Sequence, residues 1–309
     1  MQQPASSEQA HKNGYQMIHR MKKLYISLAA ALIAALPALS QSSQDFLRKY
    51  NLLVSQVGPG GVGVETLLDN WAKADQDNAD MLTARYNCYL TKAQSTEIIT
   101  RKEKKYLGLD PILSLQDSTG TPMYYFQILK YDDELFGEAV KAVDRAIDVY
   151  PGRLEYRFMK ANAYVSYERE SPDMALANLL SLVEEYSGGD NKWTFEGEVA
   201  DDEFFAHAMQ EYCITFHTLA TPSSYEAFRK LSEAMLQHYP ARHVFRSNIG
   251  TYYMQVEKNY KTALKYYGQV LKKVPDDYTS IANSLIAARK LKNRKLEKKY
   301  MDMLQKLER

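Results

Sequence analysis

The sequence predicts an all-α protein: an α-solenoid of antiparallel helix pairs, with a small inserted loop or β-hairpin near residues 110–127. Two observations indicate this fold class. Three segments place small or apolar residues at helical spacing and then stop at a proline, and they span residues 136–151, 225–240 and 260–275. A further helical stretch follows each of them, and self-similarity at a period of about 34 residues is typical of helical-repeat arrays.

The proline-ended segments are the second helices of the predicted pairs. A proline cannot continue a helix, because it lacks the backbone N–H and its ring clashes with the preceding turn. The prolines are Pro151, Pro240 and Pro275. The residues that share one face of these helices are Ala139, Val143 and Ala146; Ala227, Leu231 and Ala234; and Ala263, Tyr267 and Val270.

Two of the following helices carry a small residue ten positions after the proline and a tyrosine three residues later. These pairs are Ala161 with Tyr164, and Gly250 with Tyr253. A small residue in mid-helix allows a neighbouring helix to approach closely, and the tyrosine lies one turn further along the same face. The pattern resembles the tetratricopeptide repeat (TPR). The resemblance covers most of residues 138–309 and fades in residues 44–94.

Two segments depart from the regular repeat, and a third segment ends the array. Residues 95–137 form an irregular insertion, in which the β-prone runs 112–116 and 123–127 flank a turn sequence. Residues 187–200 are expected to form a loop inserted between repeats. Residues 278–309 read as one more helix pair with a polar outer face, which suits the capping of a stack.

The N-terminal part of the chain reads as an export signal. Met21 is followed by two lysines, an apolar run over residues 24–36 and small residues at 38 and 40. A transmembrane anchor is the alternative, but the run is shorter than the roughly 20 residues that span a bilayer. We therefore expect a signal peptide at 21–40 with cleavage near Ser40. No cysteine near that site offers a point for lipid attachment.

Residues 1–20 are polar and patternless, which indicates a non-native extension from an upstream start; whether Met1 or Met21 is the true start stays open. The mature chain, 41–309, is then a single TPR-like domain that is periplasmic or secreted. Composition agrees, with 45% hydrophobic and 25% charged residues, as in a chain that buries a core. The net charge of +1 gives no general attraction to nucleic acid.

The sequence offers no recognisable chemistry. The glycines of 58–63 lack the Lys-Ser/Thr of a phosphate loop, and a turn between helices explains them better. The acidic segment 190–203 lacks the ligand spacing of a calcium loop. The histidines after residue 40 show no zinc-binding spacing, so we expect no metal, no cofactor and no catalysis. Cys88 and Cys213 each sit among apolar residues, so two separate core positions are favoured over a disulfide.

The resemblance implies that the first helix of each pair lines a concave groove that takes a protein or peptide. The residues it places there are Phe158, Asn162, Val165, Val244, Ser247, Thr251, Met254, Ala282, Ile286 and Arg289. The peptide-carboxylate clamp of some family members is not carried over, because Phe158 stands where its lysine would be. The alternative for any one of these residues is packing against a neighbouring repeat or the inserted loop.

The function expected from these features is an exported, non-catalytic scaffold that binds a protein or peptide partner. The alternative is a module that binds an envelope glycan, with Trp193, Tyr124 and Tyr125 as the stacking rings. A third possibility is contact of the basic residues after Lys258 with an anionic polymer, although a solvated helix face more often explains such an excess of charge.

Overall fold

The computed structural model describes residues 40–189 and 192–307. The expected extension at 1–20 lies outside the described residues, as does the expected signal peptide except for the backbone of Ser40. The chain divides into two compact units. The N-terminal unit comprises Met1–Tyr167 and Lys192–Val199, and the C-terminal unit comprises Glu168–Asn191 and Ala200–Arg309.

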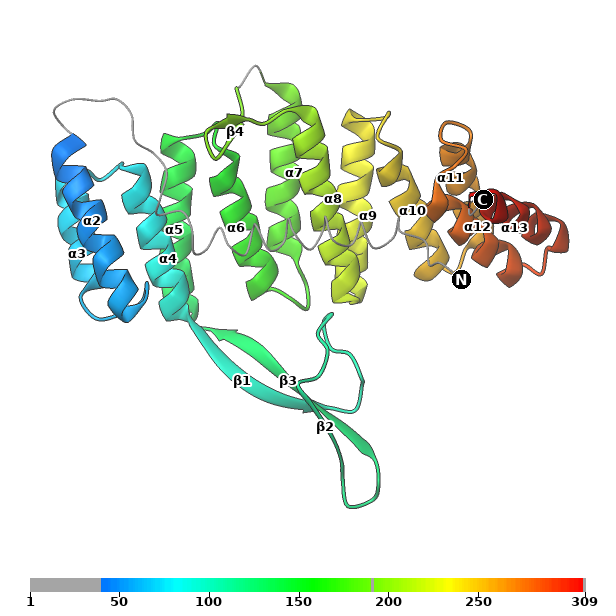
Figure 1. The fold of residues 1–309 in the computed structure, drawn as a ribbon, viewed down its shortest axis with the longest axis horizontal. Helices are drawn as coiled ribbons and strands as arrows, with labels where there is room; N and C mark the ends of the chain where they lie inside the picture. Colours follow the sequence, from blue (N-terminus) through cyan, green and yellow to red (C-terminus); the bar gives the residue numbers. More distant parts are fainter. Residues whose placement is uncertain (1–39, 190–191, 308–309) are drawn as a thin grey trace. The chain divides into compact units, whose positions relative to one another are not determined.

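The described part of the N-terminal unit contains five helices, a three-stranded sheet and a short hairpin (Figure 1). The helices are α2 (Ser40–Val57), α3 (Val64–Ala74), α4 (Ala79–Ala93), α5 (Asp133–Val149) and α6 (Leu154–Tyr167). The glycine-rich segment between α2 and α3 is a turn, as predicted. Gly58 and Gly63 there have φ angles of 78° and 85°, which favour glycine. Trp71 of α3 is fully buried and stacks on Phe46 of α2, so the first two helices pack around this indole.

The described part of the C-terminal unit consists of seven helices. They are α7 (Asp173–Gly188), α8 (Asp202–Leu219), α9 (Pro222–His238), α10 (His243–Gln255), α11 (Tyr260–Leu271), α12 (Tyr278–Lys290) and α13 (Arg294–Leu307). Polar side chains cap several helix starts. Asp201, Asn259 and Asp277 accept backbone N–H bonds at the starts of α8, α11 and α12, and Thr221 forms a capping box with Ser224 at the start of α9.

The predicted fold class is confirmed: the described chain is built from helix pairs and carries a three-stranded antiparallel sheet and a two-stranded hairpin. The helices predicted to end at proline stop at Val149, His238 and Leu271, shortly before Pro151, Pro240 and Pro275. Most residues that define the repeat pattern are buried. The buried ones are Ala139, Ala146, Ala161, Tyr164, Ala227, Gly250, Ala263 and Tyr267, whereas Tyr253 is half-buried.

The sheet in the insertion after α4 is larger and more regular than the hairpin that the sequence predicted. Its strands are β1 (Gln94–Arg101), β2 (Leu113–Gln116) and β3 (Pro122–Tyr131), in the order β1-β3-β2. The hairpin of β2 and β3 was predicted, and its turn is held by Asp117, which accepts bonds from Thr119 N at 2.8 Å and Thr121 N at 2.9 Å. Strand β1 was not predicted, although it pairs with β3 along its whole length.

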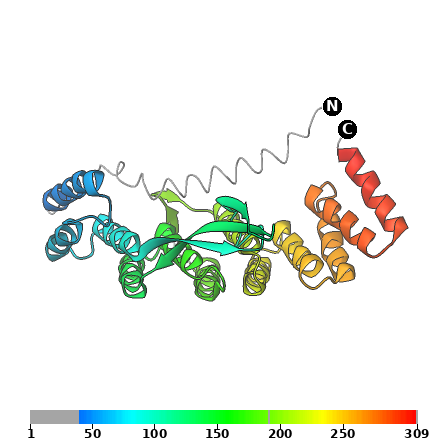
Figure 2. The same ribbon diagram turned by 90° about the horizontal axis from the view of Figure 1, so that it is seen from below.

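The predicted end of this insertion, residue 137, is wrong because α5 already begins at Asp133. The Asp132 side chain accepts a bond from Leu135 N and caps the helix, while Asp132 N donates to Ala93 O at 2.9 Å. This second bond brings the two ends of the insertion together. The sheet is therefore an excursion between the paired helices α4 and α5, as Figures 1 and 2 show.

The segment predicted as a loop at 187–200 contains more regular structure than expected. Helix α7 continues to Gly188, and the strands β4 (Thr194–Phe195) and β5 (Glu198–Val199) form a short hairpin. Thr194 N donates to Gly152 O at 2.9 Å, so the hairpin is attached to the turn before α6 within the N-terminal unit. Among the helices described, none is both long and apolar enough to cross a membrane.

Candidate partner-binding surface

The first helices of the C-terminal pairs, α8, α10 and α12, are joined side by side by polar contacts. Asn248 of α10 donates to Oε1 of Gln210 on α8 at 2.8 Å. On the other side of α10, Thr251 Oγ1 accepts from Asn283 of α12 at 3.4 Å, and Ser247 and Ser280 hydroxyls lie 3.3 Å apart. Helix α10 therefore lies between α8 and α12.

Each of these three helices exposes one aliphatic side chain close to the bridging polar residues. Ile214 is 45% exposed, Val244 42% and Ile286 44%. Residues three or four positions apart share a helix face. Ile214 follows Gln210 by four residues, Val244 precedes Ser247 by three, and Ile286 follows Asn283 by three. We call Ile214, Val244 and Ile286 the first-helix row.

Polar groups flank the first-helix row. His217 Nε2 lies 2.7 Å from Gln255 Oε1, which adds a further link between α8 and α10. Arg289, one turn after Ile286, is exposed and forms an ion pair with Glu297 at 2.9 Å. Next to the row, Glu211 is largely enclosed by its neighbours, and this burial raises the pKa of its carboxyl. The exposed aliphatic side chains of the first-helix row therefore lie among polar groups.

Three of the residues predicted to line a groove are instead core residues, which corrects that prediction. Phe158 is 3% exposed, and its ring lies 5.9 Å from that of Phe195 in the β4–β5 hairpin. Ser247 and Met254 are each 6% exposed. Ser247 contacts Ser280, and Met254 packs with Tyr267 in the core between α10, α11 and α12. None of these three side chains presents a surface that a partner could bury.

The other predicted groove residues keep some exposure. Val244, Ile286 and Arg289 are exposed, whereas Asn162, Val165, Thr251 and Ala282 are half-buried. Asn162 and Val165 belong to the N-terminal unit together with Phe158. Ile214 was not among the predicted groove residues, since no proline precedes α8 at the repeat position.

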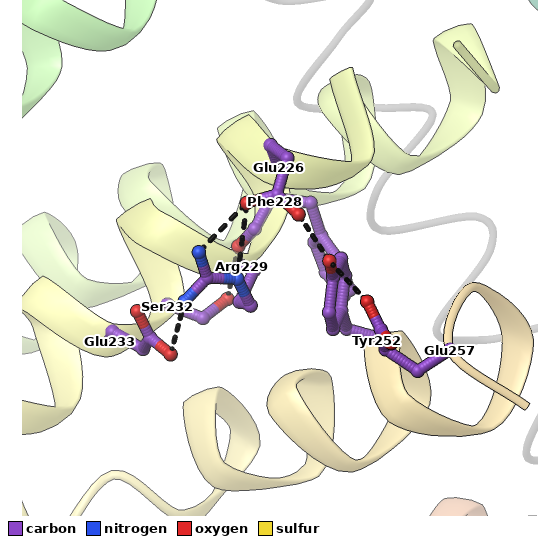
Figure 3. A network of polar contacts seen from close by, with 7 residues as sticks. All are labelled: Glu226, Phe228, Arg229, Ser232, Glu233, Tyr252 and Glu257. Atoms are coloured by element: carbon purple, nitrogen blue, oxygen red, sulfur yellow. Dashed lines mark hydrogen bonds and ion pairs between the residues drawn. The ribbon is translucent and has the colours of Figure 1, made fainter. Parts of the chain in front are cut away.

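A polar network connects α9 to α10, and Figure 3 shows its residues. The Tyr252 hydroxyl contacts the carboxylates of Glu226 and Glu257, the latter at 3.1 Å. Arg229 donates to Glu226 and to Glu233, each at 2.7 Å. The Tyr252 hydroxyl and then Arg229 hold the pKa of Glu226 below its ordinary value of 4.5. Burial, followed by these carboxylates, raises the pKa of Tyr252.

The remaining candidate groups are enclosed. Cys88 and Cys213 are both buried and free, as the sequence analysis favoured, and burial raises the pKa of the Cys213 thiol to about 12. Trp193 is 5% exposed, so it cannot stack on a glycan, and this corrects the alternative that relied on it. Tyr124 and Tyr125 are half-buried. Among the residues placed by the structure, no group of three or more His, Cys, Asp or Glu side chains could hold a metal ion.

Comparison with known proteins adds two distant structural neighbours. No family model matches the chain, and no curated protein matches it. The crystal structure of YrrB, a TPR protein with an unusual peptide-binding site, is 14% identical, with 80% of this chain and 98% of that chain covered and a TM-score of 0.35. MamA from Desulfovibrio magneticus RS-1 is 10% identical, with 78% and 99% covered and a TM-score of 0.34. Both TM-scores are low, so the fold class is assigned from the helix pairs and the buried repeat residues of this chain. These features define a TPR-like helical-repeat protein.

Proposed function

We propose that this chain is an exported, non-catalytic TPR-like scaffold that binds a protein or peptide partner through the first-helix row. The observation that carries the proposal is the exposure of one aliphatic side chain on each of three neighbouring first helices. Single exposed aliphatic residues are ordinary, but three on neighbouring helices, each close to polar side chains, can together contact one partner.

The size of the row sets the kind of partner. Full burial of an aliphatic side chain contributes about 1.5–3 kcal/mol, and these three side chains are already partly covered. The row alone therefore supplies roughly 2–4 kcal/mol, which corresponds to an affinity of about one to thirty millimolar. A useful complex needs further contacts, and His217 and Arg289 lie where they can hydrogen-bond a partner. A segment with apolar side chains along one face and polar groups along its edges fits this surface.

The export part of the proposal rests on the sequence at residues 21–40. Helix α2 begins at Ser40, so cleavage near this residue leaves the helix that packs on Trp71 nearly complete. N-terminal sequencing of the exported protein is expected to start near Gln41 or Ser42. A mature protein that still begins at Met1 or Met21 would contradict export by cleavage.

The binding proposal is tested by capture of partners from an envelope extract with the mature chain and its variants. Val244→Ser and Ile286→Ser are expected to weaken capture of the same partner about fivefold each, since each removes roughly 1 kcal/mol of apolar contact. Met174→Ser is the matched control, because Met174 is 44% exposed on the second helix α7 of the same unit.

Two readouts separate this site from its alternatives. Capture through the row persists at high salt, whereas capture by the basic residues of α12 and α13 falls as salt screens their charge. Thermal melting of each variant verifies that the fold is intact. Equal capture by all three variants would show that the partner binds elsewhere or that the chain has no such partner.

A further inference from the structure

Strand β1 is a long edge strand, and its outer side is not paired with another strand among the described residues. It pairs with β3 over all eight of its residues, and the order β1-β3-β2 leaves its other side without a neighbouring strand among the described residues. An antiparallel strand directs every second pair of backbone N–H and C=O groups to that free side, where another strand can bind them. Figure 1 shows the strand running from the end of α4 along the outer side of the insertion.

The composition of β1 does not block such pairing. Natural edge strands are usually protected by lysine, proline, a bulge or short length. β1 reads QSTEIITR: it contains no lysine or proline, and four of its eight residues are β-branched. Its one acidic and one basic residue, Glu97 and Arg101, cancel in charge.

The register gives the two faces of the sheet different roles. Ile99 lies opposite Phe126, which is fully buried, and the Tyr106 ring lies 5.9 Å from Phe126. Arg101 lies over the Tyr106 ring on this same side, so the segment after β1 covers this face. The opposite face carries four exposed aliphatic residues: Ile98, Leu113, Leu115 and Leu129.

We propose that β1 pairs with β1 of a second copy of this chain, antiparallel and about a two-fold axis at Ile99, to form one six-stranded sheet. An axis perpendicular to the sheet keeps the covered face of both copies on one side and the aliphatic face on the other. Each copy contributes the same strand, so the interface is closed and ends at a dimer.

The charges of β1 select this register. With the axis at Ile99, each Glu97 lies opposite Arg101 of the second copy, and Ile99 lies opposite Ile99. Opposite charges directly across two strands are favourable, whereas like charges are unfavourable. An axis at Glu97 or at Arg101 would place like charges face to face. Glu97 also forms an ion pair with Lys130 of its own chain at 3.0 Å, which holds its carboxylate on this face of the sheet.

A charge-swap experiment tests the register directly, with the full chain studied by sedimentation velocity over a wide concentration range. Glu97→Lys and Arg101→Glu each replace two favourable pairs with two like-charge pairs, so each is expected to raise the dimer dissociation constant by roughly ten- to thirtyfold. The double variant restores opposite charges and is expected to return to within about threefold of the original value. Lys130→Gln removes the partner of Glu97 within the chain and is expected to leave the dimer unchanged.

A cysteine cross-link provides a second test, because the two native cysteines are buried. In Ile99→Cys the two thiols face each other across the axis at a Cα separation of about 5 Å, which suits a disulfide. In the control Thr96→Cys the two thiols are about 20 Å apart. Mild oxidation is expected to link the first variant and not the second.

Three results would overturn the proposal. The first is a chain that stays monomeric at every concentration tested, and the second is a dimer that responds to neither single charge reversal. The third is equal cross-linking at positions 96 and 99. A dimer that survives both reversals would place the contact on another surface, such as the first-helix row.

Discussion

Gly250 of α10 lies directly beneath the ring of Tyr267 in α11: a Cβ atom at position 250 would come within 2.7 Å of Tyr267 Cε1. Tyr267 is fully buried, and its hydroxyl lies 3.1 Å from Thr251 Oγ1. The ring is therefore held from several sides and has little room to move. This contact explains why the first helix carries a small residue at this position.

The Gly250–Tyr267 contact yields a paired prediction. Gly250→Ala gains about 1 kcal/mol of helix propensity, but overpacking against a fixed ring costs about 1–3 kcal/mol, and we expect net destabilisation of about 1 kcal/mol. Gly268→Ala in α11 meets nothing within 4 Å and should stabilise the protein by about 0.5–1 kcal/mol. Chemical unfolding of the two variants measures the difference, and changes of the same sign would show that the ring yields to the new methyl group.

The sequence predicted those elements whose boundaries are set by residues close to them in the chain. Helices that stop before Pro151, Pro240 and Pro275 could be predicted because proline acts on its own turn. Strand β1 could not be predicted, since Ile98 and Ile99 are adjacent and break the alternation expected of a half-buried strand. Its pairing with β3 also depends on a partner more than twenty residues away.

The exposure of the predicted groove residues likewise depends on whether residues distant in sequence cover them. Val244 and Ile286 are exposed as a groove residue must be, because no distant segment among the described residues covers them. Phe158 also lies on the predicted groove face of its helix but is covered by Phe195, 37 residues later in the chain. A helical register fixes which face a residue lies on, but it does not reveal what an insertion will cover.

Phe158→Ala is therefore expected to act on stability. Removal of a buried phenylalanine ring costs about 3–5 kcal/mol, through lost transfer energy and the cavity that remains. We expect early thermal melting together with unchanged partner capture at low temperature. A variant that melts normally but loses capture would restore the original interpretation of Phe158 as an exposed anchor.

The network in Figure 3 predicts a pH-dependent contribution to stability. The pKa of Glu226 is lowered in the folded protein. Its ionised carboxylate therefore stabilises the fold fully above pH 4.5, and this stabilisation is lost as the pH falls through the folded pKa. Tyr252→Phe removes the main cause of this lowering. Because Glu226 is 40% exposed, solvent weakens its charged hydrogen bond with Tyr252. We therefore expect Tyr252→Phe to lower the free energy of unfolding by about 1 kcal/mol at neutral pH.

The stability difference between the original chain and Tyr252→Phe should narrow as the pH falls below 4.5. Other carboxyls behave in the opposite way, since burial raises the pKa of Glu155 and Glu211. The comparison between the two proteins cancels those contributions, because both contain the same groups. Urea unfolding of both proteins at several pH values measures the difference in their free energies of unfolding. A difference that stays constant as the pH falls below 4.5 would contradict the assignment to Glu226.

The last prediction concerns the attachment of the inserted sheet. The bond from Asp132 N to Ala93 O closes the insertion at its base, and the covering contact of Tyr106 with Phe126 lies wholly inside it. Replacement of residues 95–130 by Gly-Ser should therefore leave α4 and α5 paired through a two-residue turn, with a loss of less than about 1 kcal/mol.

Tyr131→Ala in the intact chain is the contrasting change, because this residue connects the end of β3 to the helices. Its ring lies 5.5 Å from the rings of both Phe136 and Tyr167, and its hydroxyl lies 2.6 Å from Ser166 Oγ. Loss of this partly buried ring should cost about 2 kcal/mol. The point substitution is thus expected to destabilise the protein more than the deletion of 36 residues that retains Tyr131. The opposite result would be a deletion variant that loses cooperative unfolding and a Tyr131→Ala variant that melts normally. It would show that the sheet stabilises the helices and that the Tyr131 ring contributes little.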